Sequence, residues 1–158
     1  MYYVYAEANT DQGYRPYCWV CLNDKDFSYT SVTKEINKEI GKNWTITNTD
    51  FEGIPHHLLE CYSLKALCEI AKLTDKYGLA IQFWLERYQR IPISEETFKH
   101  VFIGSYDDME SYAEYWIDSI GGNFIPEQFI DLEGLAKWLL YDFYVRQDNV
   151  GKVHVFKP

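Results

Sequence analysis

Apolar residues repeat with two different periods along this chain, and the order of these periods limits the folds it can adopt. Residues 3–8, 17–22 and 44–49 alternate between polar and apolar side chains, which predicts three strands. A helical spacing, with apolar residues four apart, interrupts them at 31–41. We therefore expect a small three-stranded sheet with one helix in the first module, residues 1–55.

After this module the helical period dominates, and strand-like patterns return only at the end of the chain. Expected helices cover residues 63–78, 79–90, 107–120 and 131–141, with a further short helix from Ser94. Phe102-Ile103-Gly104 is expected to interrupt the helices, and strands at 143–146 and 153–156 form a closing hairpin. The pattern predicts an α+β protein of three small modules in a row, at residues 1–55, 56–102 and 103–158.

Negative charge is concentrated in one segment. The 158 residues include 24 acids and 15 bases, a net charge of −9. Residues 95–142 hold 11 of the acids and two bases, whereas residues 1–94 are nearly balanced at −2. Phosphates would be repelled by such a segment, so we expect a basic protein partner and no direct binding to nucleic acid or to an anionic membrane.

The sequence predicts a soluble cytoplasmic protein. Its start has no basic segment ahead of an apolar one, as a signal peptide would have. No apolar run approaches the roughly 20 residues that a membrane span requires.

Sequence motifs of common enzymes are missing. The chain has no phosphate loop, no Gly-x-Gly-x-x-Gly, no His-Glu-x-x-His and no Gly-x-Ser-x-Gly. His100 and His154 follow apolar or strand-like stretches, which favours structural roles. The adjacent acids at 95–96 and 107–108 lie at helix starts, where we expect them to be solvated. We therefore predict that the protein is not an enzyme and needs no cofactor.

Cys18 and Cys21 have the two-residue gap of a zinc knuckle, but their context argues against a metal site. Both fall in the expected strand at 17–22, where residues three apart point to opposite faces. The sequence contains no second pair of this kind, and we predict that no metal is bound.

One face of the expected helix at 107–120 is acidic. At 100° per residue its acids fall within about 100°, and apolar side chains, Ile120 among them, occupy the opposite side. Residues 105–108, at the start of this helix, have capping-box spacing. Such a stripe could enter a groove lined by Lys and Arg that normally holds DNA; the alternative is an ordinary solvated helix face.

Four tryptophans lie on the apolar sides of their expected elements. We expect Trp19, Trp44, Trp84 and Trp116 to be mostly buried. For Trp138 we expect a position near the surface or near a dimer contact.

Five segments, in order along the chain, resemble motifs of one known family. They are residues 3–6 with Gly13 and Trp19, residues 50–55 (Asp-Phe-Glu-Gly-Ile-Pro), residues 102–106 with 112–114, residues 130–139, and residues 142–144 with 153–156. Together they resemble the ArdA-type antirestriction proteins, small acidic DNA mimics carried by mobile elements. The resemblance spans nearly the whole chain.

This resemblance implies a function without chemistry or cofactor. The expected partner is a type I restriction–modification enzyme, whose DNA-binding channel would be occupied by a long, curved, acidic homodimer built through the C-terminal module. The alternative is an acidic module that binds another basic DNA-binding protein or regulator. The acidic surface expected to contact the partner comprises Asp107, Asp108, Glu110, Glu114, Asp118, Glu127, Asp131, Glu133 and Asp142.

Overall fold

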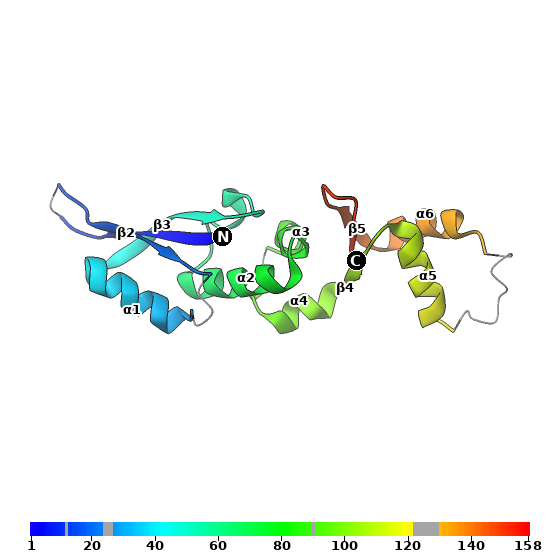
Figure 1. The fold of residues 1–158 in the computed structure, drawn as a ribbon, viewed down its shortest axis with the longest axis horizontal. Coiled ribbons are helices and arrows are strands. Elements are labelled where there is room, and N and C mark those ends of the chain that lie inside the picture. Colours follow the sequence, from blue (N-terminus) through cyan, green and yellow to red (C-terminus); the bar gives the residue numbers. More distant parts are fainter. Residues whose placement is uncertain (12, 24–26, 90, 122–129) are drawn as a thin grey trace. The chain divides into compact units, whose positions relative to one another are not determined.

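The computed structural model describes residues 1–158 except 12, 24–26, 90 and 122–129 (Figure 1). It consists of two compact units, Met1–Ser94 and Glu95–Pro158. Each unit contains a three-stranded antiparallel sheet and helices, which confirms the α+β class. The predicted division into three modules is not confirmed by these two units and stays a prediction. Among the described residues, no helix has the length and apolar character of a membrane span.

Three strands form the sheet of the first unit, and they follow the predicted alternation. They are β1 (Tyr2–Ala8), β2 (Tyr17–Cys21) and β3 (Trp44–Phe51), in the order β2-β1-β3. Val4 and Ala6 of the central strand are fully buried. Tyr3 and Tyr5, which alternate with them, point to the other, more exposed face. The period of two therefore identified correctly which residues share a face.

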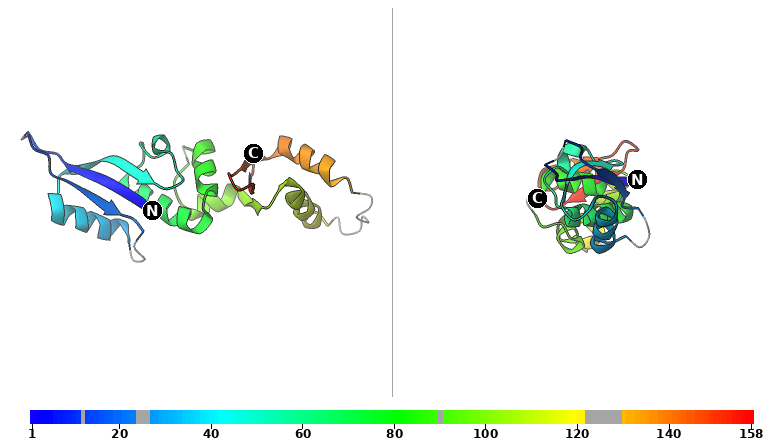
Figure 2. Two further views of the ribbon diagram at one scale, coloured as in Figure 1. Left: turned by 45° about the horizontal axis from the view of Figure 1, so that its top comes forward. Right: turned by 90° about the vertical axis from the view of Figure 1, so that its left-hand side faces the viewer.

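Helix α1 (Tyr29–Ile40) covers one face of this sheet (Figure 2). Ser28 and Ser31 form a reciprocal capping box at its start, which satisfies two backbone N–H groups that the helix leaves open. Val32 and Ile36, one turn apart, are buried against β1 and β2. None of the described helices covers the opposite face of the sheet in this way.

Two consecutive helices complete the first unit, preceded by a short 3₁₀ turn, η1 (His56–Leu58). They are α2 (Leu64–Tyr77) and α3 (Ala80–Arg87), close to the predicted 63–78 and 79–90. Gly78 ends α2 with a φ of 59°, a conformation that other residues adopt only at a cost, and its N–H donates to the carbonyl of Thr74. Trp84 of α3 is fully buried and anchors this core.

The second unit contains a strand that the sequence did not reveal. Helix α4 (Glu95–Val101) leads directly into β4 (Phe102–Tyr106), where we expected only an interruption. This strand pairs with β6 (Val153–Phe156), which also pairs with β5 (Tyr144–Gln147), in the order β4-β6-β5. The closing hairpin is thus the larger part of a three-stranded sheet. A five-residue strand that contains Gly104 has a weak local signal, and pairing across 49 residues between Ser105 and His154 stabilises it.

Helices α5 (Met109–Ser119) and α6 (Leu132–Asp142) pack against each other beside this sheet. Their shared core consists of Tyr112, Ala113, Ala136, Leu139 and Val155. Helix α5 begins two residues later than the helix expected at 107–120, and Ser105 is not its N-cap. Ser105 belongs to β4, and the helix begins after Asp108, whose side chain accepts from the N–H of Ser111.

Burial of the tryptophans follows the prediction only in part. Trp84 is buried and Trp44 and Trp116 are half-buried, but Trp19 is 48% exposed, so its predicted burial is wrong. The predicted alternation of β2 is correct. The sequence did not predict that none of the described helices packs on the face to which Trp19 points. Ile120, expected on the apolar side of its helix, is exposed as well because it follows the last residue of α5.

Trp138, on α6, is 51% exposed and lies edge-to-face with Trp116 of α5 at a ring distance of 6.1 Å. Its expected place near the surface is confirmed. The contact between the two rings ties α6 to α5 at the edge of the shared core.

Candidate functional site

Three of the nine predicted acidic residues form one exposed stripe along α5. Glu110, Glu114 and Asp118 follow one another at intervals of four residues, and all three are exposed. Each step advances the stripe by about 6 Å along the helix axis. Tyr112 and Ala113 are buried on the side that faces α6, so the stripe points to solvent because the core fixes the rotation of the helix. We call these three residues the α5 stripe.

The carboxylates of the α5 stripe are not neutralised by any cation that the structure describes. Helix α5 contains no Lys or Arg. In the part of the chain that the structure describes, no cationic side chain lies within ion-pair distance of these three residues or of Asp142. The negative charge of the stripe is therefore available to a partner.

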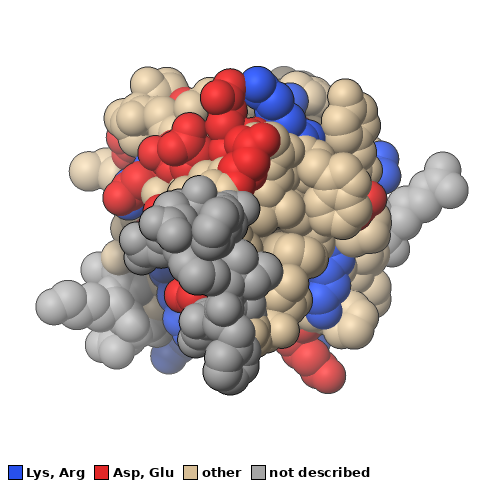
Figure 3. Space-filling model, turned by 90° about the vertical axis from the view of Figure 1, so that its right-hand side faces the viewer, with Lys and Arg blue, Asp and Glu red and all other residues tan. Residues whose placement is uncertain are grey.

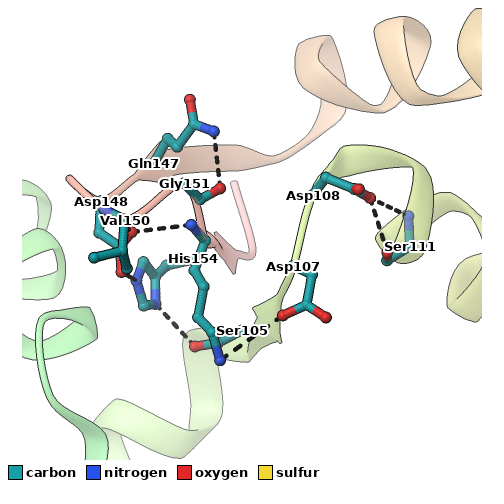
Figure 4. A network of polar contacts seen from close by, with 10 residues as sticks. Ser105, Asp107, Asp108, Ser111, Gln147, Asp148, Val150, Gly151 and His154 are labelled. Carbon is teal, nitrogen blue, oxygen red and sulfur yellow. Dashed lines mark hydrogen bonds and ion pairs between the residues drawn. The ribbon is translucent and has the colours of Figure 1, made fainter.

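Asp107 and Asp108 do not belong to the stripe, contrary to their predicted place on the helix. Asp107 lies before α5 and forms a long ion pair, 3.8 Å, with Lys152 (Figure 4). Asp108 is the N-cap and accepts two hydrogen bonds of 2.8 Å from Ser111, one from the backbone N–H and one from the hydroxyl. The backbone N–H and the hydroxyl of Ser111 lower the pKa of Asp108 below its ordinary value. Both side chains remain exposed, but Asp108 also has a structural role.

The acids of α6 do not form a second stripe. Asp131 is the N-cap, Glu133 lies in the first turn and Asp142 is the last residue of the helix. Glu133 and Asp142 are nine residues apart and so project from opposite sides. Glu133 is also paired with Lys137 at 2.6 Å, which reduces its net contribution. Glu127, the remaining predicted residue, lies outside the described residues.

Charge is distributed unevenly over the surface. On the face shown in Figure 3, one cluster of acidic side chains is visible at the upper left, with further acidic side chains apart from it, whereas Lys and Arg form no comparable cluster. This arrangement gives a localised negative potential, which attracts basic partners more strongly than the same charges would if they were dispersed.

A surface pocket lies beside the α5 stripe. Its volume is about 350 Å³, and it is lined by Glu114, Ile117, Asp118, Ile130 and Leu132. Two carboxylates and three apolar side chains suit a Lys or Arg side chain, whose stem is apolar and whose head is cationic.

His154 is the centre of a polar network in the second unit that the sequence did not predict (Figure 4). Its Nδ1 is 2.8 Å from the hydroxyl of Ser105, and its Nε2 is 3.3 Å from Asp148. The other oxygen of Asp148 accepts from the N–H groups of Val150 and Lys152. The Asp-Asn-Val-Gly sequence at 148–151 signals a turn, but only the paired strands bring Ser105 to His154.

This Ser–His–Asp set differs from a hydrolase triad. In a triad Nε2 faces the serine and Nδ1 faces the aspartate, whereas here the two ring nitrogens are exchanged. His154 is also buried, with 5% of its surface exposed, and Asp148 is held by the turn that it closes. The network fits the structural role expected for His154.

The cysteines offer no clustered ligand set. Cys18 and Cys21 are both half-buried and free, on the strand β2 as predicted. Within the described residues, no three His, Cys, Asp or Glu side chains lie close enough together to hold a metal ion.

Asp131 allows the role of a helix cap to be separated from the role of its charge. Its Oδ1 accepts from the N–H of Gly134 at 2.9 Å. Asp131→Ala should therefore lower the free energy of unfolding by about 1 kcal/mol, whereas Asp131→Asn should retain most of it. Urea unfolding followed by circular dichroism measures both variants. An equal loss in the two would mean that the charge, not the cap, stabilises α6.

Comparison with known proteins gave a match to a family model. A family model described as antirestriction protein (ArdA) matches residues 11–153 of the 158-residue chain. The search of curated proteins found no match.

Proposed function

The chain belongs to the ArdA family of antirestriction proteins, and we propose that it inhibits type I restriction–modification enzymes as an acidic mimic of duplex DNA. In this proposal the protein occupies the channel in which such an enzyme binds DNA and carries out no chemistry itself. The observation that supports it most directly is the α5 stripe, whose carboxylates are exposed and have no cationic partner among the described residues.

The spacing of the α5 stripe supports an electrostatic mimic. Carboxylates about 6 Å apart carry roughly half the charge per unit length of one DNA strand, in which phosphates follow every 3.4 Å or so. A channel built to bind phosphates with Lys and Arg would contact such a row through several weak interactions. Displacement of counterions from the channel would make binding depend on salt, as it does for DNA.

The pocket beside the stripe supplies a second kind of contact. Glu114 and Asp118 line it together with apolar side chains. A Lys or Arg from the channel would place its stem against Ile117 and Leu132 and its charge near the two carboxylates. Such an inserted side chain would fix the position of the mimic in a way that dispersed charges alone would not.

We also propose that the protein acts as a homodimer through its C-terminal unit. Trp138 and Tyr141, three residues apart and so on one side of α6, are 51% and 89% exposed. Large apolar side chains grouped on one helix are typical of a surface that is covered by another protein. A second copy on this surface would double the number of acidic stripes presented to one enzyme.

Another basic DNA-binding protein, such as a regulator, remains the alternative partner. The same stripe and pocket would suit it, since Lys and Arg are the side chains recognised in both cases. The two functions differ in where the effect occurs: plating of unmodified phage would improve only in cells that contain a type I system if the proposal is right.

The acidic stripe can be tested with a matched pair of variants. Glu110→Gln/Glu114→Gln removes two charges of α5 that have no cationic partner among the described residues. Glu35→Gln/Glu39→Gln removes two charges at the same spacing from α1, where Lys34 and Lys38 alternate with them. Exposed contacts contribute about 0.2–1 kcal/mol each, so the α5 pair should weaken binding to a type I enzyme about tenfold at low salt. The α1 pair should have little effect. Affinity measured against salt should also fall less steeply for the α5 variant.

Equal weakening by the two pairs would mean that net charge alone controls binding and would remove the stripe from the interface. If Glu110→Gln by itself abolished binding, a single specific contact would replace the distributed mimic. Sedimentation and circular dichroism of each variant control for assembly and folding.

A further inference from the structure

The first unit has an open aromatic surface that the proposed function does not use. On β1 and β2 the residues that point away from α1 are Tyr3, Tyr5, Glu7, Tyr17, Trp19 and Cys21. Tyr17 is 57% exposed and Trp19 is 48% exposed. We call the outer side of this sheet, together with Thr45, Asn48 and Asp50 of β3, the aromatic face.

Three rings of the aromatic face form one cluster. Tyr5 is at its centre, with ring distances of 4.9 Å to Trp19 and 5.3 Å to Tyr17. Tyr5 is paired directly with Trp19 across the strands, and Glu7 with Tyr17, so the register places the rings side by side. Two large rings of one cluster are therefore presented to solvent on a rigid sheet, which is the arrangement of a stacking surface.

The charges on this face select among the ligands that stack on aromatic rings. Glu7 lies opposite Tyr17, and Asp50 lies opposite Tyr3 at the other end. The nine positions of the face include no Lys or Arg. Nucleic acid would stack on the rings but would bring its phosphates to two carboxylates, with no cation on the face to offset them. A flat cation meets both requirements, since it stacks on the rings and is attracted by the carboxylates.

We propose that the aromatic face binds an arginine-bearing segment of a protein partner. A guanidinium stacked on Trp19 or Tyr17 would lie near Glu7, which can accept two of its hydrogen bonds. Lysine is a poorer fit because its ammonium is compact, strongly hydrated and unable to stack. This site lies in the first unit and does not depend on the α5 stripe.

The test uses the full chain and two short peptides. Acetylated, amidated tri-arginine and tri-lysine carry the same charge, and both are titrated into the protein while the tryptophan indole signals are followed by NMR. Trp19→Thr identifies the indole signal of Trp19, and threonine keeps the strand preference of β2. We expect the Trp19 signal to shift to saturation with tri-arginine, with a Kd about two- to fivefold below that for tri-lysine. The preference should remain at about 0.3 M salt, where attraction between dispersed charges is largely screened.

Two variants test whether the carboxylate of Glu7 contributes to the binding of tri-arginine. Glu7→Gln should raise the Kd for tri-arginine about two- to fivefold, whereas Glu39→Gln, on α1, should leave it unchanged. The indole signal of Trp138, which is exposed in the second unit, separately reports binding of the peptides to the acidic surface of that unit.

Three results would overturn the proposal: no shift of the Trp19 signal, equal affinity for the two peptides, or a saturable shift with oligo(dT) instead. The last would assign the face to single-stranded nucleic acid. None of these results bears on the antirestriction assay with the α5 variants, so failure here and failure of the proposed function are distinguishable.

Discussion

Tyr112→Ala should abolish antirestriction activity by unfolding the C-terminal unit, even though Tyr112 carries no charge. Its ring is 1% exposed and lies 5.0 Å from the ring of Tyr106 and 5.6 Å from that of Phe143. Burial raises the pKa of its hydroxyl to about 12. Removal of a fully buried aromatic ring costs about 3–5 kcal/mol, a large part of the stability of a domain of this size.

Two variants of the same helix separate folding from binding. Tyr112→Phe keeps the ring contacts and should retain most of the stability. Glu114→Gln, on the exposed side of α5, should leave the free energy of unfolding nearly unchanged and affect binding alone. Urea unfolding and phage plating are measured for all three variants. A folded Tyr112→Ala protein without activity would contradict this prediction, because the loss of activity would then not arise from unfolding.

Most secondary structure could be predicted because its signals are local. The alternation in β1 and the four-residue spacing in α1 and α2 depend on side chains within one element. Strand β4 could not be predicted in this way. Its five residues become a strand because β6 pairs with them, and the sequence of β4 contains no trace of that partner.

The position of α5 shows how a small error in a helix start changes a predicted site. The periodicity correctly placed Glu110, Glu114 and Asp118 on one side. With the helix expected from residue 107, the stripe also included Asp107, which in fact precedes the helix. Ser105 and Asp108 both suit an N-cap, and only the pairing of Ser105 in β4 decides between them.

The exposure of Trp19 could not be predicted either, for a reason that differs from those for β4 and α5. Alternation along β2 identifies the residues that share a face, but coverage of that face depends on where helices pack. Helix α1 buries Val4 and Ala6 and leaves Trp19 and Tyr17 in solvent. A rule that places tryptophan in the core therefore failed at the one face of this sheet that is open.

Asp148→Ala should destabilise the C-terminal unit strongly at neutral pH and much less in acid. Asp148 and His154 have side chains that are each only 6% exposed. The carboxylate accepts hydrogen bonds of 3.0 Å from Val150 and 2.9 Å from Lys152 and contacts His154 at 3.3 Å. Hydrogen bonds to a charged, poorly exposed group contribute about 1.5–3 kcal/mol, so we expect a loss of about 2–3 kcal/mol at pH 7 or so.

The pH dependence follows from the direction of the pKa shift. Burial raises the pKa of Asp148, but hydrogen bonds from Val150, His154 and Lys152 outweigh it, so the pKa is lower than its ordinary value of 3.8. The stabilisation is therefore complete above the ordinary value and is lost as the pH falls through the lowered one. Urea unfolding of wild type and Asp148→Ala should show a difference in the free energy of unfolding that shrinks between about pH 7 and pH 2.

Asp107→Ala is the control. The side chain of Asp107 is 85% exposed and comes no closer than 3.8 Å to Lys152, so little change in the free energy of unfolding is expected at either pH. An equal loss for Asp148→Ala at both pH values would mean that the shape of the turn, and not the charge that holds His154 and the two N–H groups, stabilises the hairpin.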